Sequence, residues 1–374
     1  MLLLEFEGKQ LLRSARVATP EGQLVRAVEE VDWEALGYPL AVKAQVADGG
    51  RGKLGGVVRA EDGEAARRAA ERLLGSGFAG NRPEALLLEP WLQSERELYL
   101  CVTVEANGDG YSVLYAPRGG VEVEAGPPPV RYPVGMAHRF RAHRLRSLLA
   151  DVEPDSQLRE RLVALARELV RLAAAQDCLT VEINPLVLTP GGELVAVDAK
   201  IVLDEAAAFR SGNIAAAMAR QLEREPAAVR RCLEARLMLV RLRGNVGLIS
   251  GGAGMTMAAM DLIAAAGGTP ACFLDCSANP TPDGYRLAFE LLDAEPQVKV
   301  ILVSIFGGAT HMARVGKTMC TLVGERNGAK PVVFRLAGTH AEQLAPIFRQ
   351  AGLHNAATLE EAVAEAVGIV GGPA

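Results

Sequence analysis

Two short segments of the chain carry residue types that bind phosphate and divalent cations. In the first, Lys43 lies at the end of an apolar run and is followed by a loop with five glycines, Arg51 and Lys53. Glycine lets backbone amides approach phosphate oxygens, and the cations offset phosphate charge. The residue order is not that of a P-loop, so a flexible surface hairpin is the alternative interpretation of this segment alone.

The second segment runs from Glu182 to Asp198 and predicts two strands joined by a turn at Pro190–Gly192. Side chains alternate along a strand, so Glu182 and Asn184 share one face. A turn centred on Gly191 places Asn184 opposite Asp198, with Cβ atoms roughly 5 Å apart. An amide oxygen and a carboxylate suit Mg²⁺, which takes its other ligands from water and nucleotide phosphates. The alternative is a solvated polar hairpin, and a slip of one residue would separate the pair.

The elements that must position these residues alternate between strand and helix patterns. Helices are predicted over 63–74 and 157–175, where apolar residues recur at helical spacing. Asn-Gly and Asp-Gly at 107–110 predict a tight hairpin, because both favour positive φ angles. Strands are predicted over 38–46, 86–89, 97–104 and 111–115.

The pattern changes near residue 240, where strands, glycine loops and helices begin to repeat. This alternation predicts a parallel doubly wound sheet. A charged helical stretch over 213–241 precedes it, which predicts domains at 1–238 and 239–374. Strands of the second domain are predicted over 245–250, 271–275, 299–306 and 331–336.

Composition excludes several classes of protein. The chain has 374 residues and is 49% hydrophobic, enough to bury the cores of two or three domains. Its net charge of −5 is spread along the chain, so neither nucleic acid nor an anionic membrane is an expected partner. No apolar run reaches the roughly 18 residues of a membrane span, and the sequence predicts no signal peptide. Scattered cysteines predict free thiols and a cytoplasmic location.

Several segments, all in the same order, resemble the β subunit of succinyl-CoA synthetase, an ATP-grasp acid–CoA ligase. The resemblance covers nearly the whole chain. It implies an α/β protein with an N-terminal ATP-grasp domain and a flavodoxin-like doubly wound CoA-ligase domain. The segments that carry it are Glu5–Leu12, Gly49–Lys53, Gly119–Glu122, Glu182–Leu186, Gly244–Asn245, Phe273–Asp275 and Phe306–Gly308.

The resemblance implies site residues in the N-terminal domain. Glu182 is implied to be catalytic, because in the family it lies where a phosphohistidine of the α subunit meets the nucleotide and could orient the imidazole. The implied ligands of Mg²⁺ are Asn184 and Asp198. ATP or GTP and CoA are the implied substrates. The residues implied to bind the nucleotide are Lys43, Gly50, Arg51, Gly52, Glu89, Leu92 and Glu97.

The loops implied to bind a small carboxylic acid depart from the family pattern. They contain Gly251, Gly308, Ala309 and Thr310, and the family would have Asn at position 251 and Arg at His311. Loss of the amide removes a hydrogen bond to a carboxylate, while Thr310 and His311 add polar groups. A site with different polar groups selects different acids, so malate or citrate is an alternative to succinate.

The sequence therefore predicts the β subunit of a nucleotide-dependent acid–CoA ligase. It would form an acyl-CoA, with release of ADP or GDP and phosphate, through a phosphohistidine on an α subunit that also carries the CoA site. A different ATP-grasp ligase and a non-catalytic scaffold paralogue are the alternatives. Lys43, Asn184 and Asp198 disfavour the scaffold, which has no chemical need for them.

Overall fold

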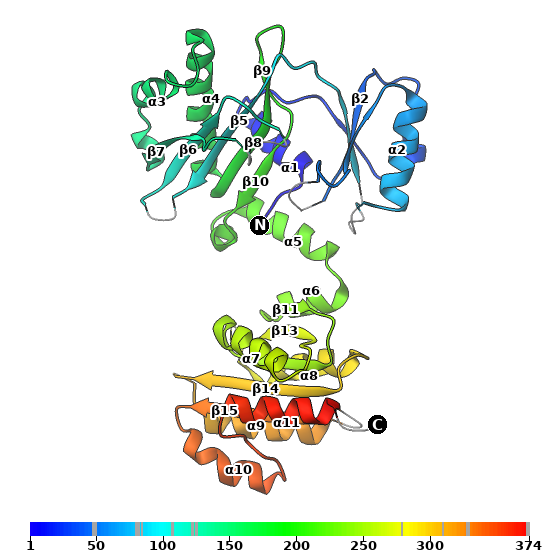
Figure 1. Ribbon diagram of the computed structural model, residues 1–374, viewed down its shortest axis with the longest axis vertical. Helices are drawn as coiled ribbons and strands as arrows, with labels where there is room; N and C mark the ends of the chain where they lie inside the picture. The colour runs from blue at the N-terminus through cyan, green and yellow to red at the C-terminus, as the bar shows by residue number, and fades with distance from the viewer. Residues whose placement is uncertain are drawn as a thin grey trace. The chain divides into compact units, whose positions relative to one another are not determined.

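A computed structural model describes residues 1–46, 51–78, 83, 85–105, 108–120, 123, 126–277, 280–308, 310–326 and 330–371. The chain divides into two compact units, Met1–Ala219 and Arg220–Ala374, each with its own sheets and cores (Figure 1). The two units are defined by how the chain packs on itself. The domain ranges 1–238 and 239–374 remain a prediction.

The smaller sheet of the first unit is antiparallel, in the order β1-β4-β2-β3. Helix α2 (Gly63–Gly75) begins after Asp62, whose carboxylate accepts the Ala65 N–H at 2.8 Å. Its buried alanines and Leu73 pack on one face of the sheet. The strands are β1 (Gln23–Val25), β2 (Leu40–Ala44), β3 (Val57–Ala60) and β4 (Leu86–Pro90).

The larger sheet has the order β10-β8-β5-β6-β7, with β9 also paired to β8. Helix α4 (Ser156–Ala175) packs its apolar face against this sheet, and Asp155 caps the helix (Figure 1). No helix among the described residues is long and apolar enough to cross a membrane. The strands are β5 (Arg96–Val104), β6 (Tyr111–Ala116), β7 (Val130–Gly135), β8 (Cys178–Leu188), β9 (Leu194–Ala196) and β10 (Lys200–Leu203).

A buried acid fixes the chain just before α4. Glu153 accepts two hydrogen bonds from the Arg96 guanidinium, at 3.0 and 2.7 Å, and one from the Tyr115 hydroxyl at 2.9 Å. Its side chain is fully buried. These bonds tie the segment after α3 to β5 and β6. The remaining helical elements of this unit are α1 (Glu5–Ser14), α3 (Ala142–Leu149), η1 (Val28–Glu30), η3 (Ala137–Arg139) and η4 (Glu205–Phe209).

The second unit is built on one five-stranded sheet in the order β11-β13-β12-β14-β15. Four strands are parallel, and their order is the second-first-third-fourth order of flavodoxin-like folds. Helices pack on both faces, which confirms the doubly wound prediction (Figure 1). The strands are β11 (Met238–Arg241), β12 (Val246–Ser250), β13 (Cys272–Asp275), β14 (Val300–Gly307) and β15 (Val332–Gly338).

Two separate cores cover the two faces of this sheet. Helices α8 (Pro282–Ala294), α9 (Met312–Glu325) and α10 (Leu344–Gln350) contribute to one core. Helices α7 (Ala253–Ala265) and α11 (Leu359–Gly371) contribute to the other. The short η5 (Ala341–Gln343) precedes α10.

The continuous helix predicted over 213–241 is wrong. The structure has α5 (Gly212–Arg224), α6 (Ala227–Glu234) and then strand β11. Pro226 caps α6 and interrupts the helical run, because proline lacks the N–H that a helix interior needs. The last four residues of the stretch pair antiparallel with β13, so pairing with the sheet overrides their helical pattern.

Candidate functional site

Strand alternation determines which side chains face the candidate nucleotide site. Leu40, Val42 and Ala44 of β2 belong to the core beneath α2, so Lys43 points to the other face. Ala41 pairs with Glu89 of β4, which places Glu89 on the same face as Lys43.

Helix α1 meets this face with charged residues. Its buried positions are Glu5, Gly8, Lys9 and Leu12, one stripe at helical spacing. The Phe6 N–H in its first turn donates to the Gln45 Oε1 atom at 3.0 Å, which anchors the start of α1 beside β2.

Six charged side chains meet there in what we call the ion cluster: Glu5, Lys9, Lys43, Arg51, Glu89 and Asp198. The Lys9 ammonium lies 2.7 Å from a Glu5 oxygen and 2.6 Å from both Glu89 oxygens. The Lys43 ammonium lies 2.9 Å from Glu5 and 2.7 Å from Glu89. Arg51 donates to Glu5 and, at 2.9 Å, to Asp198. Three acids balance three bases, so the formal charge of the ion cluster is zero.

Mutual pairing favours the charged forms of Glu5 and Lys43 despite burial, whereas burial outweighs pairing at Lys9 and lowers the pKa of its ammonium. Burial disfavours the Glu5 carboxylate, but Lys43, Arg51 and Lys9 outweigh it and hold its pKa well below the usual range. Burial disfavours the Lys43 ammonium in the same way, yet Glu5, Glu89 and Asp198 raise its pKa. The pKa of Asp198 is raised, because burial and the Glu5 charge together outweigh the nearby cations.

The hairpin register is confirmed. Leu186 pairs with Ala196 and Glu182 pairs with Lys200, which is the same register on both sides of Asp198. Asn184 therefore lies opposite Asp198. The turn closes with Gly192 at a φ of +80°, a left-handed conformation that glycine adopts without strain.

The side-chain oxygen atoms of Asn184 and Asp198 could supply some, but not all, of the ligands of a divalent cation. The Asn184 Oδ1 atom accepts the Gly120 N–H at 2.6 Å, and the Asp198 Oδ1 atom accepts from Arg51 and from the Ala199 N–H. The Asp198 side chain is 37% exposed, and no described residue bonds its Oδ2 atom. Within the described part of the chain no three His, Cys, Asp or Glu side chains form a metal site. Such a cation would need further ligands from water or phosphate.

Other predicted residues of this unit lie outside the ion cluster. Leu92 is half-buried in the connection before β5, while Glu97 on β5 and Gly52 are exposed. The Glu182 carboxylate lies 3.7 Å from the Lys200 ammonium and shares a face with Asn184. Gly50 lies outside the described residues.

In the second unit, Gly251 and Gly308 follow the adjacent parallel strands β12 and β14 and so lie at one edge of the sheet. This is the edge where open α/β sheets bind ligands. The Gly308 carbonyl accepts the Thr339 hydroxyl at 2.6 Å, and Thr310 is half-buried. His311 caps α9 and stacks on His340, with ring centroids 4.1 Å apart. Ala309 lies outside the described residues.

Comparisons with known proteins identify both units. Residues 2–188 match the ATP-grasp domain family, and residues 249–369 match the CoA-ligase family. The succinate–CoA ligase [ADP-forming] subunit beta of Ignicoccus hospitalis is 36% identical over 375 residues, covering 98% of each chain. The chain belongs to the succinate–CoA ligase β-subunit family. The subunit of this name from Desulfurococcus amylolyticus is 33% identical over 380 residues and covers all of both chains.

A solved structure shares the fold of this β-type chain. ATP citrate lyase from Methanothrix soehngenii, in complex with citrate and coenzyme A, superposes with a TM-score of 0.75 at 19% identity, covering 98% of this chain and 99% of that one. The β-type chain is thus an α/β protein with an N-terminal ATP-grasp domain and a C-terminal CoA-ligase domain.

The CoA-ligase domain of this β-type chain buries polar groups without partners. Ser250 on β12, Ser304 on β14 and Arg335 on β15 lie at one register across three adjacent strands, a set we call the polar row. Both serine hydroxyls, and the Nε and Nη1 atoms of Arg335, are buried and have no hydrogen-bond partner among the residues that the structure describes. Such groups normally find a protein, water or ligand partner.

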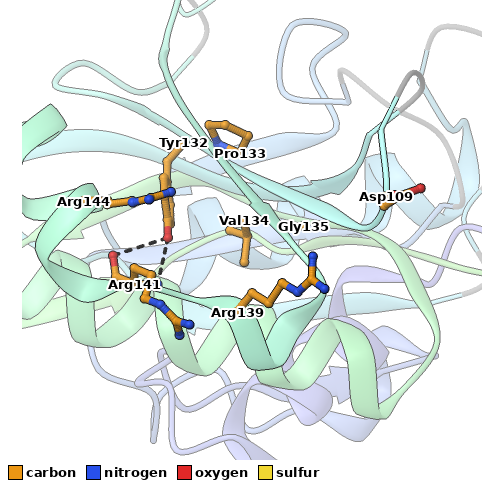
Figure 2. A pocket seen from close by; sticks show the side chains of 8 residues that line it. All are labelled: Asp109, Tyr132, Pro133, Val134, Gly135, Arg139, Arg141 and Arg144. Atoms are coloured by element: carbon orange, nitrogen blue, oxygen red, sulfur yellow. Dashed lines mark hydrogen bonds between the residues drawn. The ribbon is translucent and has the colours of Figure 1, made fainter.

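A separate pocket of the ATP-grasp domain is lined by arginines. Figure 2 shows Arg139, Arg141 and Arg144 around it, with Asp109 at the far side. The Tyr132 hydroxyl accepts the Arg141 N–H at 2.8 Å and fixes the start of α3. No acidic side chain among the described residues pairs with these three guanidinium groups. The pocket contains none of the residues predicted for the nucleotide site.

Sequence reasoning missed five residues that the structure brings to these sites, one of which is Ser250 of the polar row. Glu5 and Lys9 belong to the ion cluster, and Ser304 and Arg335 to the polar row. The signal in the sequence was a charged residue at a helical position that faces the core, because Glu5 and Lys9 lie on the same buried stripe of the helix as Leu12.

Proposed function

We propose that this chain is the catalytic β subunit of a nucleotide-dependent acid–CoA ligase that works with an α-type subunit. The observation that carries the proposal is that Lys43 and Arg51 meet at Glu5, and that Arg51 also pairs with Asp198, which lies opposite Asn184. Two cations and an oxygen pair at one point suit a nucleotide polyphosphate. Its presence in one chain with a CoA-ligase domain favours activation of a carboxylic acid.

In the proposed reaction the nucleotide phosphorylates a histidine of the α subunit, this histidine phosphorylates the acid, and the CoA thiolate attacks the acyl phosphate. Lys43, Arg51 and the amides of Gly50 and Gly52 would bind phosphate oxygens. Glu182 would orient the imidazole. Positioning and charge neutralisation supply most of the rate enhancement in such transfers.

The remaining predicted residues complete this proposal. Asn184 and Asp198 would hold Mg²⁺, which when bound offsets the charge of the phosphates. The residues proposed to surround the base and ribose are Glu89, Leu92 and Glu97. The residues proposed to contact the acid are Gly251, Gly308, Ala309 and Thr310.

The start of α9 would assist at the acid. Its first N–H groups and positive dipole end favour an anion such as an acyl phosphate. No acidic residue occupies its first turn.

The test is CoA-dependent release of ADP or GDP by the chain co-purified with its α-type partner, across succinate, malate and citrate. Turnover with any one of these acids supports the proposal and names the substrate. Nucleotide binding without turnover of any acid would overturn the ligase proposal. A chain that also fails to bind nucleotide would be a scaffold.

A further inference from the structure

Glu5 pairs with the two cations that are proposed to bind phosphate. Its carboxylate contacts both proposed phosphate-binding cations, lying 2.9 Å from the Lys43 ammonium and accepting a hydrogen bond from Arg51. A carboxylate makes the same charge-assisted hydrogen bonds to ammonium and guanidinium groups that a phosphate makes. Glu5 is 3% exposed, so these contacts are made away from water.

We propose that Glu5 is an internal counter-anion of the nucleotide site, for which the phosphates of an arriving nucleotide compete. This inference rests on the proposed role of Lys43 and Arg51. Before the nucleotide binds, Glu5 holds both cations ionised and oriented. When the nucleotide binds, its phosphates take over some of these contacts, and Glu5 takes them back when the nucleotide leaves.

The charge balance of the ion cluster supports this role. Buried charges are costly unless they are paired, so Lys43 and Arg51 need an anion while the site is free. Glu89 and Asp198 supply two negative charges against three buried cations, and Glu5 supplies the third. A polyphosphate therefore enters a site that is already neutral, and Glu5 must lower its affinity.

Lys9 should affect nucleotide affinity in the opposite direction from Glu5. Its ammonium is fully buried and pairs only with Glu5 and Glu89 among the described residues. It touches neither Arg51 nor Asp198, yet its charge adds to the field at the site. A change at Lys9 should therefore shift nucleotide affinity in the opposite direction from a change at Glu5.

The experiment measures the dissociation constants of ADP and inorganic tripolyphosphate for the full chain by isothermal titration calorimetry. We expect about tenfold tighter binding by Glu5→Gln and about tenfold weaker binding by Lys9→Gln, from removal of one close charge in each case. The double variant restores neutrality and should bind within about threefold of the unchanged protein. Glu5→Asp keeps the charge and should also stay near the unchanged value.

The matched control is Glu71→Gln, an exposed partner of Arg67 on α2, which should leave both dissociation constants unchanged. Thermal melting shows whether each variant is folded. If Glu5→Gln does not fold, Lys9→Gln and Glu5→Asp carry the test. Unchanged or tighter binding by Lys9→Gln overturns the inference.

The outcomes separate this inference from the proposed function. If the unchanged protein binds ADP and Glu5→Gln binds it no tighter, Glu5 has only a structural role and the ligase proposal stands. If the unchanged protein binds neither ADP nor tripolyphosphate, both proposals fall.

Discussion

The two domains treat buried polar groups in opposite ways. In the ATP-grasp domain, every charge of the ion cluster has an oppositely charged partner within the protein. In the CoA-ligase domain, the polar row of Ser250, Ser304 and Arg335 has buried atoms with no partner among the described residues. A ligand that bound at the first site would displace contacts within the protein, whereas a ligand at the second would supply partners to buried polar atoms.

The largest expected effect is on stability in the ion cluster. Lys9→Met leaves Glu5 and Glu89 short of a cation, so the free energy of unfolding should fall by about 3–5 kcal/mol. Urea unfolding followed by circular dichroism measures it. Arg67→Met breaks an exposed pair on α2 and should cost about 1 kcal/mol or less. A Lys9→Met loss no larger than that of the control would mean that the ion cluster is open to water.

The second effect concerns turnover at the hairpin. Asp198→Ala and Asn184→Ala should each lower kcat about 100-fold or more in the complex with the α-type subunit, because each removes a proposed cation ligand. Initial rates across a range of Mg²⁺ concentrations measure this loss. Glu193→Ala, in the exposed turn of the same hairpin, is the control. Near-normal turnover of either variant at ordinary Mg²⁺ would remove that residue from the metal site.

The third prediction concerns stability in the polar row, where a substitution should have the opposite effect from Lys9→Met in the ion cluster. Arg335→Met removes a guanidinium with unpartnered buried atoms, so the free energy of unfolding should stay the same or rise by up to about 1 kcal/mol. The same urea titration measures it, with Ser304→Ala as the companion variant. A fall as large as that of Lys9→Met would show that Arg335 has a strong partner in solution, and the contrast between the domains would fail.

The smallest effect is on thiol labelling. Burial raises the pKa of Cys272 to about 11, and Cys320 is the one cysteine that is not buried. Thiolate is the reactive form, so iodoacetamide at pH 8 should modify Cys320 first, and labelling of Cys272 should rise only as pH approaches its pKa. Mass spectrometry of timed samples measures this order. Labelling of Cys272 as early as Cys320 would mean that the sheet of the polar row opens readily.

Most of the fold was predictable because periodicity is local. The strand expected over 299–306 is β14 (Val300–Gly307), and the helix expected over 157–175 is α4 (Ser156–Ala175). The register at Asn184 and Asp198 was predictable because a short turn determines pairing. Strand β11 was not, because its pairing partner β13 lies some thirty residues away.

The polar contacts were less predictable than the backbone. Glu89 was identified from a resemblance, but its partners Lys9 and Lys43 come from two other elements. Arg335 stands alone in an apolar strand, and only the alignment of β12, β14 and β15 reveals its neighbours. Contacts between elements that are distant in sequence depend on tertiary packing, which local patterns do not encode.

The hairpin that carries Asn184 also has a practical use. Strand β8 is held by β5 on one side and by β9 and β10 on the other, so pairing along its whole length supports the register that the turn sets. The turn residues Pro190 and Gly191 are exposed at the tip. A fluorescent reporter inserted there would leave the spacing of Asn184 and Asp198 intact. The protein thus offers an attachment point for a fluorescent signal that would test, in real time, whether a nucleotide binds at the proposed site.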